Sequence, residues 1–334
     1  MNSPIRKFGR FYNNSKEYCE RYLELFICLA KGVYKQLVIY SSSLWKGRAR
    51  RPAEIGKWKV EYFQEKLSSD NSITWIGHSS FLIHLENKNI LTDPIFGSPS
   101  FLFPRIIKPG IFFNQLPKID YVLLSHNHWD HMSPKCLRQI YELFPSVLFL
   151  IPQGDGRWFK KWALPFREFS WGDSFVSNSL KLTFLTSHHW SQRSVFDQNK
   201  SLWGSWMIEG FEKKIYFGGD TAYGDHFKAI AKKFYNIDIA LLPVGPCEPR
   251  RWMRKSHMNS EDAVQAFQDL QAKAFIPMHW GTFHFGTDNF DTPIKLLKSV
   301  WPKNLDLRVL KIGETYTDFS LPKILRSKGA ESST

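Results

Sequence analysis

Short apolar runs recur along the chain from about residue 70 onward, and most of them end in polar or charged residues. Runs of this length, rich in Ile, Leu, Val, Phe and Trp, are typical of buried β-strands. The expected strands cover residues 73–76, 80–85, 89–92, 121–125, 146–151, 180–185, 203–208, 214–217, 237–243 and 274–278. Polar and helical segments separate them, including a helix that is expected to begin at Asn259 or Ser260. This order predicts two sheets packed together and flanked by helices.

The first sixty residues follow a different pattern. Residues 1–16 are polar and basic, and we expect them to be loose. From about Lys16 to Tyr40, apolar residues recur at helical spacing, which predicts an amphipathic helix. This helix could cover a face of the main domain or lie on a membrane. We therefore divide the chain into a basic, helical N-terminal extension (1–60), a main domain (61–320) and a flexible polar tail (321–334).

The densest group of metal-binding side chains follows the apolar run 121–125. It reads His126-Asn127-His128-Trp129-Asp130-His131. Ser133 and Pro134 then offer a helix N-cap and a first helical residue, so the group is expected on a loop between a strand and a helix. A histidine-rich surface loop is the alternative. However, three imidazoles and a carboxylate held together are what zinc, iron or manganese binds.

Three further candidates lie just past other apolar strands, namely His189, Asp220 and His279. Taken singly, each could be a surface, turn or core residue. Loops on a rigid scaffold carry function, and the shared placement of these side chains could gather all of them at one sheet edge. The sequence therefore predicts two metal ions. One is bound by His126, His128 and His189, the other by Asp130, His131 and His279, with Asp220 bridging them.

Charge and composition narrow the setting of this site. The chain of 334 residues has a net charge of +14, and aromatic residues make up 16% of it. The charge favours lipid headgroups, phosphate-bearing substrates or nucleic acid as partners, although a diffuse excess of Lys and Arg would give the same value. Four cysteines without a C-x-x-C pair indicate a reducing compartment. Because no apolar run is long enough to span a bilayer, we expect a cytoplasmic protein, peripheral to a membrane at most.

The motif His126-x-His128-x-Asp130-His131, followed by Asp220 and His279, resembles that of the metallo-β-lactamase superfamily. More specific stretches, from about residue 70 to 315, resemble the N-acyl-phosphatidylethanolamine-hydrolysing phospholipase D family. They include Leu91–Phe96, Leu202-Trp203-Gly204-Ser205-Trp206, Glu248-Pro249-Arg250 and His279-Trp280-Gly281-Thr282-Phe283. The resemblance implies an α+β four-layer αββα sandwich with two Zn²⁺ per chain at one edge. The residues 61–320 would then be a hydrolase domain of this superfamily.

The same resemblance implies a zinc-dependent phosphodiesterase of phospholipase D type. It would hydrolyse N-acyl-phosphatidylethanolamine to N-acylethanolamine and phosphatidate. A lactonase, or another ester or phosphodiester hydrolase on the same binuclear site, is the alternative. Since one superfamily hosts many chemistries, the fold alone does not choose between these substrates.

Roles for two further residues follow from the resemblance. Asp93 is expected to hold a ligand histidine by its second nitrogen, or else to be a turn residue before Pro94. His257 is expected to protonate the leaving alkoxide or bind phosphate, and Asp130 is counted as catalytic as well as a ligand. The family pattern has no counterpart of residues 1–60. Cys247 stands where the family more often has an aromatic residue, which leaves the fit of the acyl chain open.

The loop 97–113 mixes apolar and basic residues between Asp93 and the ligand strand. Phe101, Leu102 and Phe103, with Arg105 and Lys108 close by, suit a membrane surface or a lipid substrate. Alternatively, the loop folds inward as the wall of an acyl-chain pocket or as core, or it contacts a second copy of the chain. The expected partners are therefore a phospholipid and a membrane surface, with a homodimer left open. Nucleic acid is not expected, because the sequence has no clear basic and aromatic RNA-binding module.

Overall fold

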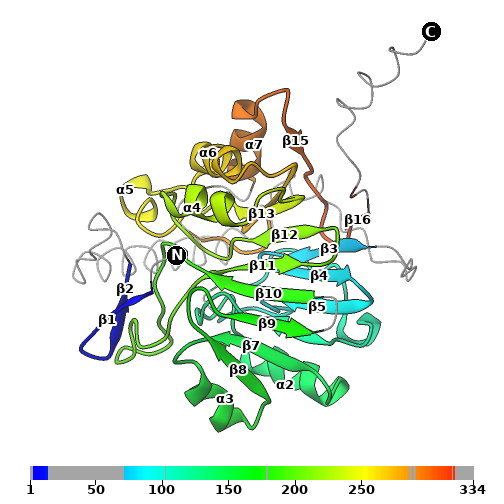
Figure 1. The fold of residues 1–334 in the computed structure, drawn as a ribbon, viewed down its shortest axis with the longest axis vertical. Coiled ribbons are helices and arrows are strands. Elements are labelled where there is room, and N and C mark those ends of the chain that lie inside the picture. The colour runs from blue at the N-terminus through cyan, green and yellow to red at the C-terminus, as the bar shows by residue number, and fades with distance from the viewer. Residues whose placement is uncertain are drawn as a thin grey trace, which may run out of the picture.

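The computed structural model describes residues 3–13, 71–101, 103–177, 180–285, 288, 291–317 and 319. Two seven-stranded sheets form the centre of this part of the chain (Figure 1). The first has the order β16-β3-β4-β5-β6-β7-β8. Its strands are β3 (Ser72–Gly77), β4 (Ser80–Leu85), β5 (Lys88–Thr92), β6 (Tyr121–Leu123), β7 (Leu148–Pro152), β8 (Phe166–Phe169) and β16 (Thr315–Tyr316).

The second sheet has the order β15-β14-β13-β12-β11-β10-β9. Its strands are β9 (Ser174–Ser177), β10 (Leu180–Leu185), β11 (Ser205–Glu209), β12 (Lys214–Phe217), β13 (Ile239–Pro243), β14 (Ala274–Met278) and β15 (Asp306–Leu307). Both sheets begin with antiparallel hairpins and continue with parallel strands, β5 to β8 in one and β12 to β15 in the other. Parallel neighbours need crossover connections, which places helices on the outer faces.

Two groups of helices cover the sheets from opposite sides (Figure 1). The helices α2 (Pro134–Leu143) and α3 (Gly156–Trp162) lie on the first sheet. On the side of the second sheet lie α4 (His226–Lys233), α5 (Arg250–Met253), α6 (Ser260–Leu270) and α7 (Thr292–Val300). A short 3₁₀ turn, η3, covers Phe113–Gln115. The predicted αββα sandwich is thus confirmed.

The strand β6 shows why the layers form. Tyr121 and Leu123 belong to the main apolar core, whereas Val122 and Leu124 belong to the second core, together with residues of α2 and α3. Successive side chains of a strand point to opposite faces, so a run that is apolar throughout needs cover on both. The helix caps follow local sequence as well. The Ser133 hydroxyl accepts from the Cys136 amide at the start of α2, and Asn259 caps α6.

The N-terminal segment differs from expectation. The strands β1 (Ile5–Lys7) and β2 (Arg10–Tyr12) form an antiparallel hairpin, with Phe8 and Gly9 at its tip, both at positive φ. Phe11 is buried, and its amide donates to the carbonyl of Asn199 at 2.7 Å. The expectation that residues 1–16 are loose is therefore wrong for residues 3–13. Three-residue strands are too short to give a periodic signal.

The predicted helix at 16–40, the rest of the extension 1–60 and the tail 321–334 lie outside the described residues. Among the helices that the structure describes, none is both long enough and apolar enough to cross a bilayer.

Candidate metal centre

Loops from both sheets meet at one edge of the sandwich, and the predicted metal-binding residues lie on these loops. The loop after β6 carries His126 to His131, the segment after β10 carries His189, and β12 and β14 lead to Asp220 and His279. Backbone hydrogen bonds tie the loops together, for example from Gly204 to Ser125 and from Ala222 to His188. All seven residues come together here, although their binding of a metal stays a prediction.

The first group consists of three imidazole rings. His126 Nε2 lies 2.8 Å from His128 Nδ1, and His189 Nε2 lies 3.1 Å from that same His128 atom. Nitrogens bound to one tetrahedral zinc stand about 3.3 Å apart at ordinary zinc–nitrogen bond lengths. The three nitrogens therefore converge at nearly the spacing that a single ion requires.

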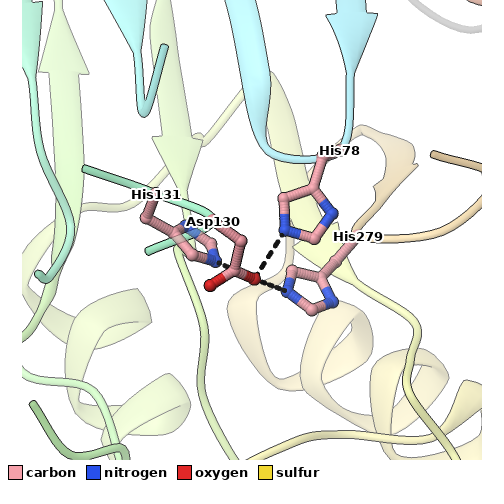
Figure 2. Close-up of side chains that lie close together, drawn as sticks. All are labelled: His78, Asp130, His131 and His279. Atoms are coloured by element: carbon pink, nitrogen blue, oxygen red, sulfur yellow. Dashed lines mark hydrogen bonds and ion pairs between the residues drawn. The ribbon is translucent and has the colours of Figure 1, made fainter. Parts of the chain in front are cut away.

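The second group is shown in Figure 2. The Asp130 carboxylate points between His131 and His279, and its Oδ2 lies 3.5 Å from His131 Nε2 and 3.7 Å from His279 Nε2. A fourth side chain, that of His78, approaches the same oxygen. The three predicted ligands thus share one small volume.

Asp220 lies between the two groups. Its Oδ2 is 3.3 Å from His131 Nε2, 3.1 Å from His279 Nε2 and 3.8 Å from His189 Nε2. One carboxylate therefore faces ligands of both groups, as the predicted bridging position requires.

The second ring nitrogens of His126, His131 and His189 are fixed by hydrogen bonds. His131 Nδ1 donates to Asp93 Oδ2 at 2.7 Å. The Ser125 hydroxyl also donates to Asp93, at 2.5 Å, and so its oxygen accepts from His126 Nδ1 at 2.9 Å. His189 Nδ1 donates to the carbonyl of Ser256 at 2.9 Å. Each of the three rings therefore turns the lone pair of Nε2 toward the centre of the site. Asp93 occupies the place that the resemblance implied.

Several donor atoms of the site are buried without a hydrogen-bond partner in the described part of the chain. They include His131 Nε2, His279 Nε2 and Asp220 Oδ1. A buried polar atom without a partner costs about 1–3 kcal/mol, so a cluster of them demands an explanation. The atoms His131 Nε2 and His279 Nε2 face the carboxylate of Asp220. The donor set fits bound metal, which would satisfy these inward-facing nitrogens.

The electrostatics of the two groups differ. Burial, reinforced by neighbouring imidazoles, holds the pKa of His126 well below its usual range and lowers the pKa of His189 to about 3. Neutral imidazole is the form that binds a metal ion. Burial opposes the charge of Asp220, but His279 and His131 outweigh it and hold its pKa well below the ordinary value. Burial likewise opposes charge on His279, yet Asp220 and Asp130 raise its pKa to about 9.

His257 lies at the rim of the site. Its Nδ1 is 3.6 Å from Asp220 Oδ2, and its ring centre is 5.1 Å from that of His189. The carbonyl of His257 accepts from Arg250 Nη1 at 3.0 Å, and Arg250 also pairs with Asp262 on α6. The Glu-Pro-Arg stretch thus positions His257 beside the predicted ligands.

His78 is not among the residues predicted from the sequence; it falls between the expected strands 73–76 and 80–85. Its Nε2 lies 3.0 Å from Asp130 Oδ2, and its ring centre is 4.0 Å from that of His279. The signal that could have found it is the one used for the other residues, because His78 directly follows the buried strand β3.

The loop 97–113 divides between the surface and the interior. Phe101 is 88% exposed and Lys108 is exposed, whereas Ile107 and Ile111 are buried. Phe103 is half-buried, with its ring centre 5.1 Å from that of Phe285. Leu102 lies outside the described residues. Part of the loop therefore folds inward, and part reaches solvent.

Arg105 does not fit the predicted role of a cation that meets lipid phosphates. Its guanidinium donates to the carbonyls of Ile76, Ile95 and Ile107 at 2.8 to 3.0 Å. Burial lowers its pKa to about 10. Because its donors are used on backbone carbonyls, Arg105 ties the loop to β3 and does not carry a free charge to the surface.

Comparison with known proteins agrees with this geometry. Residues 88–280 match the family profile described as Beta-lactamase superfamily domain. Igni18, described as a metallo hydrolase from the archaeon Ignicoccus hospitalis KIN4/I, shares the fold with a TM-score of 0.57. It is 22% identical, and the match covers 74% of this chain and 98% of that one. The chain belongs to the metallo-β-lactamase superfamily and is a metal-dependent hydrolase.

Within this superfamily the chain resembles lipid-hydrolysing members. It is 32% identical over 252 residues to N-acyl-phosphatidylethanolamine-hydrolyzing phospholipase D 1 of Caenorhabditis elegans, covering 70% of this chain and 71% of that protein. It is 30% identical over 239 residues to the mitochondrial N-acyl-phosphatidylethanolamine-hydrolyzing phospholipase D of Saccharomyces cerevisiae. That match covers 67% of this chain and 50% of the yeast protein.

Proposed function

We propose that the protein is a zinc-dependent phosphodiesterase of phospholipase D type, acting on N-acyl-phosphatidylethanolamine. The observation that carries the proposal is the pair of donor groups on either side of Asp220, next to a wall of aromatic side chains. The names of the worm and yeast relatives support the choice of substrate.

The two donor groups would each hold one zinc ion. When bound, the zinc ions would neutralise the charge on the phosphoryl oxygens and lower the pKa of the attacking water enough for it to lose a proton near neutral pH. Asp93 and Ser125 prepare the site for them, since they fix the rings of His131 and His126 with Nε2 turned inward. Such outer hydrogen bonds orient ligands and raise their basicity.

Hydrolysis requires one proton at the leaving group. The oxygen of water forms a bond to phosphorus while the water releases a proton, the bond between phosphorus and the ethanolamine oxygen breaks, and the ethanolamine oxygen gains a proton. We assign this transfer to His257, which lies beside the centre and outside the seven predicted ligands. Burial lowers the pKa of His257 to about 3, so the ring is neutral at rest and passes on the proton that the water releases. A well-placed general acid contributes about 10² to 10⁴ in rate.

An aromatic wall beside the metal centre suits a lipid substrate. The ring of Phe283 lies 4.9 Å from that of His78, Phe285 lies 5.7 Å from Phe283, and Phe103 continues the row. A small cleft beside His279 is lined by Phe283, Phe285 and Pro246, among others. Aromatic rings offer large apolar area, so this wall could receive acyl chains while the headgroup meets the metals.

The exposed part of the loop 97–113 would bring the enzyme to its substrate. Phe101 is available to enter the acyl boundary, and Lys108 to meet phosphates. The net charge of +14 suits an anionic, cytoplasmic membrane face. We therefore place the protein in the cytoplasm, peripheral to a membrane.

The test is hydrolysis in H₂¹⁸O. Zinc-loaded protein is incubated with vesicles that contain N-acyl-phosphatidylethanolamine, and the products are identified by mass spectrometry. We expect N-acylethanolamine without label and phosphatidate carrying one ¹⁸O atom, because water attacks phosphorus. The Asp220→Asn variant should give neither product. Label in a released fatty acid, or turnover only of lactones, would favour the ester hydrolase or lactonase instead.

A further inference from the structure

His78 lies in an unusual turn at the metal centre. It follows Gly77 at the end of β3, and its φ of +56° places it in the left-handed region, which non-glycine residues seldom occupy. Gly77 has a φ of +123°, and a Cβ there would stand 2.5 Å from Arg105 Nη2. The turn therefore requires glycine at one position and accepts backbone strain at the next, and such strain clusters at functional sites.

The backbone of His78 is fixed on both sides. Its amide donates to Thr282 Oγ1 at 2.7 Å, and its carbonyl accepts from Trp75 Nε1 at 2.9 Å. The carbonyl also accepts from the amide of His279 at 3.2 Å. These hydrogen bonds hold the strained conformation, and they connect His78 directly to the backbone of a predicted ligand.

The side chain of His78 reaches a second predicted ligand. Its Nε2 lies 3.0 Å from Asp130 Oδ2, and the ring is 2% exposed. Figure 2 shows the two side chains pointing at each other, with His131 and His279 on the other sides of the carboxylate. An ionised carboxylate only accepts hydrogen bonds, so Nε2 of His78 carries the hydrogen.

The side chain of Asp130 requires a hydrogen-bond donor to fix its orientation. Its side chain is 17% exposed, more than that of His131 or His279, and it stands on a loop. Within the described part of the chain, its hydrogen bond from outside the seven predicted ligands comes from His78. Asp93 holds His131 in the same group by an analogous contact.

We propose that His78 is a positioning residue of the second metal site and that its Nε2–H group holds the Asp130 carboxylate by a hydrogen bond. The proposal rests on the metal centre of the proposed function and deepens it. The contact aims Oδ2 of Asp130 at the space shared with His131 and His279. Without it the carboxylate can rotate away, and one of the two zinc ions binds more weakly.

The test compares two substitutions that separate the ring from the hydrogen bond. His78→Phe keeps a ring against His279 but has no donor, whereas His78→Gln places an amide donor near the position of Nε2. The matched control is His84→Phe on the adjacent strand β4, because this half-buried histidine contacts Asn89 away from the site. Metal-free proteins are titrated with zinc against a chelating indicator, and unfolding is followed separately without metal.

We expect wild-type protein and the His84→Phe variant to bind two zinc ions with equal affinities. His78→Phe should weaken one of the two by about 10- to 100-fold, the usual effect of losing an outer hydrogen bond to a ligand. His78→Gln should lie closer to wild type. Unchanged zinc affinities in His78→Phe, or equal losses in both His78 variants, would overturn the role of His78. Wild-type protein that binds no zinc would instead overturn the metal centre.

A measurement on wild-type protein covers the case in which His78→Phe does not fold. In zinc-loaded protein labelled with ¹⁵N on histidine, the ring spectrum should show His78 protonated on Nε2. A metal-bound Nε2 would make His78 a direct ligand, and protonation on Nδ1 alone would remove the hydrogen bond. Either result overturns the proposal.

Discussion

His131 Nδ1 donates to Asp93 Oδ2 at 2.7 Å, and both side chains are fully buried. Asp93 comes from the segment after β5 and His131 from the loop after β6, which lies beside it as a parallel strand. The same carboxylate receives two hydrogen bonds from Ser125. One buried acid therefore sets the orientation of the loop that carries the predicted ligands.

Replacing Asp93 with Asn should weaken zinc binding while leaving the fold intact. The amide is neutral and has one acceptor oxygen, so it cannot serve Ser125 and His131 as the carboxylate does. We expect a loss of about 10- to 100-fold in zinc affinity, measured by competition with a chelator. The control is Asp120→Asn, which removes a charge that pairs with Lys88 away from the site. Equal effects of the two substitutions would show that charge alone matters.

The metal content tests the division of the ligands into two groups. Purified protein should carry close to two zinc ions per chain, because the donor atoms form two groups that share Asp220. Asp220→Asn should reduce occupancy at both positions, whereas His189→Ala should chiefly affect one. Elemental analysis provides the measurement. Active protein without any bound transition metal would rule out this assignment.

Much of the predicted site could be read from sequence. His126, Asp220 and His279 each follow a strand so apolar that it must be buried. Hydrophobic packing does not explain an ionisable residue at such a position, so each one indicates a functional site. The strands themselves are predictable for the same reason, because a strand that is buried on both faces appears in the sequence as a continuous apolar run. The edge strands β8 and β9 are partly exposed, so they contain no continuous apolar run and are not predicted.

Other features depend on contacts that no local pattern reports. His78 works through Asp130, 52 residues away, and its backbone is held by Thr282. The sequence predicts Arg105 as a surface cation because no acidic partner marks it as buried. Its actual partners are backbone carbonyl oxygens, which every residue has and which therefore leave no mark in the sequence. The hairpin β1–β2 is held by the loop around Asn199, and its own sequence shows only short, basic strands. The periodicity of apolar residues does not reveal hydrogen bonds to backbone groups that are distant in the sequence.

The role of His257 predicts a defect in turnover without a defect in metal binding. His257→Ala should lower kcat by about 10² to 10⁴ on the natural phosphodiester while zinc content stays unchanged. A phosphodiester with p-nitrophenol as leaving group needs no proton, so its hydrolysis should be much less affected. The ratio of the two rates is the measurement. Equal losses on both substrates would point to substrate positioning or to metal binding.

The stability of the protein should depend on Asp155. Burial raises the pKa of this carboxyl to about 7, against the hydrogen bond from Asn127. The folded state thus holds a proton that the unfolded state releases near pH 4. The stabilising contribution is complete below about pH 4 and is lost as pH rises through about 7. The free energy of unfolding should therefore fall over this range relative to that of the Asp155→Asn variant. Denaturant titrations at several pH values measure the difference, and a constant difference would contradict the shift.

The exposed tip of the loop 97–113 gives the last prediction. Phe101 is 88% exposed, and the half-buried Phe103 of the same loop joins the aromatic wall beside the metal centre. Phe101→Ser should weaken binding to vesicles and hydrolysis of vesicle lipid, but should spare a short-chain soluble phosphodiester. Phe211→Ser is the matched control, since this residue is 83% exposed in the turn before β12, at the opposite end of that strand from Asp220. Vesicle flotation and the two hydrolysis rates measure the effect. Equal losses on both substrates, or the same loss of vesicle binding in the control, would argue against a membrane contact at Phe101.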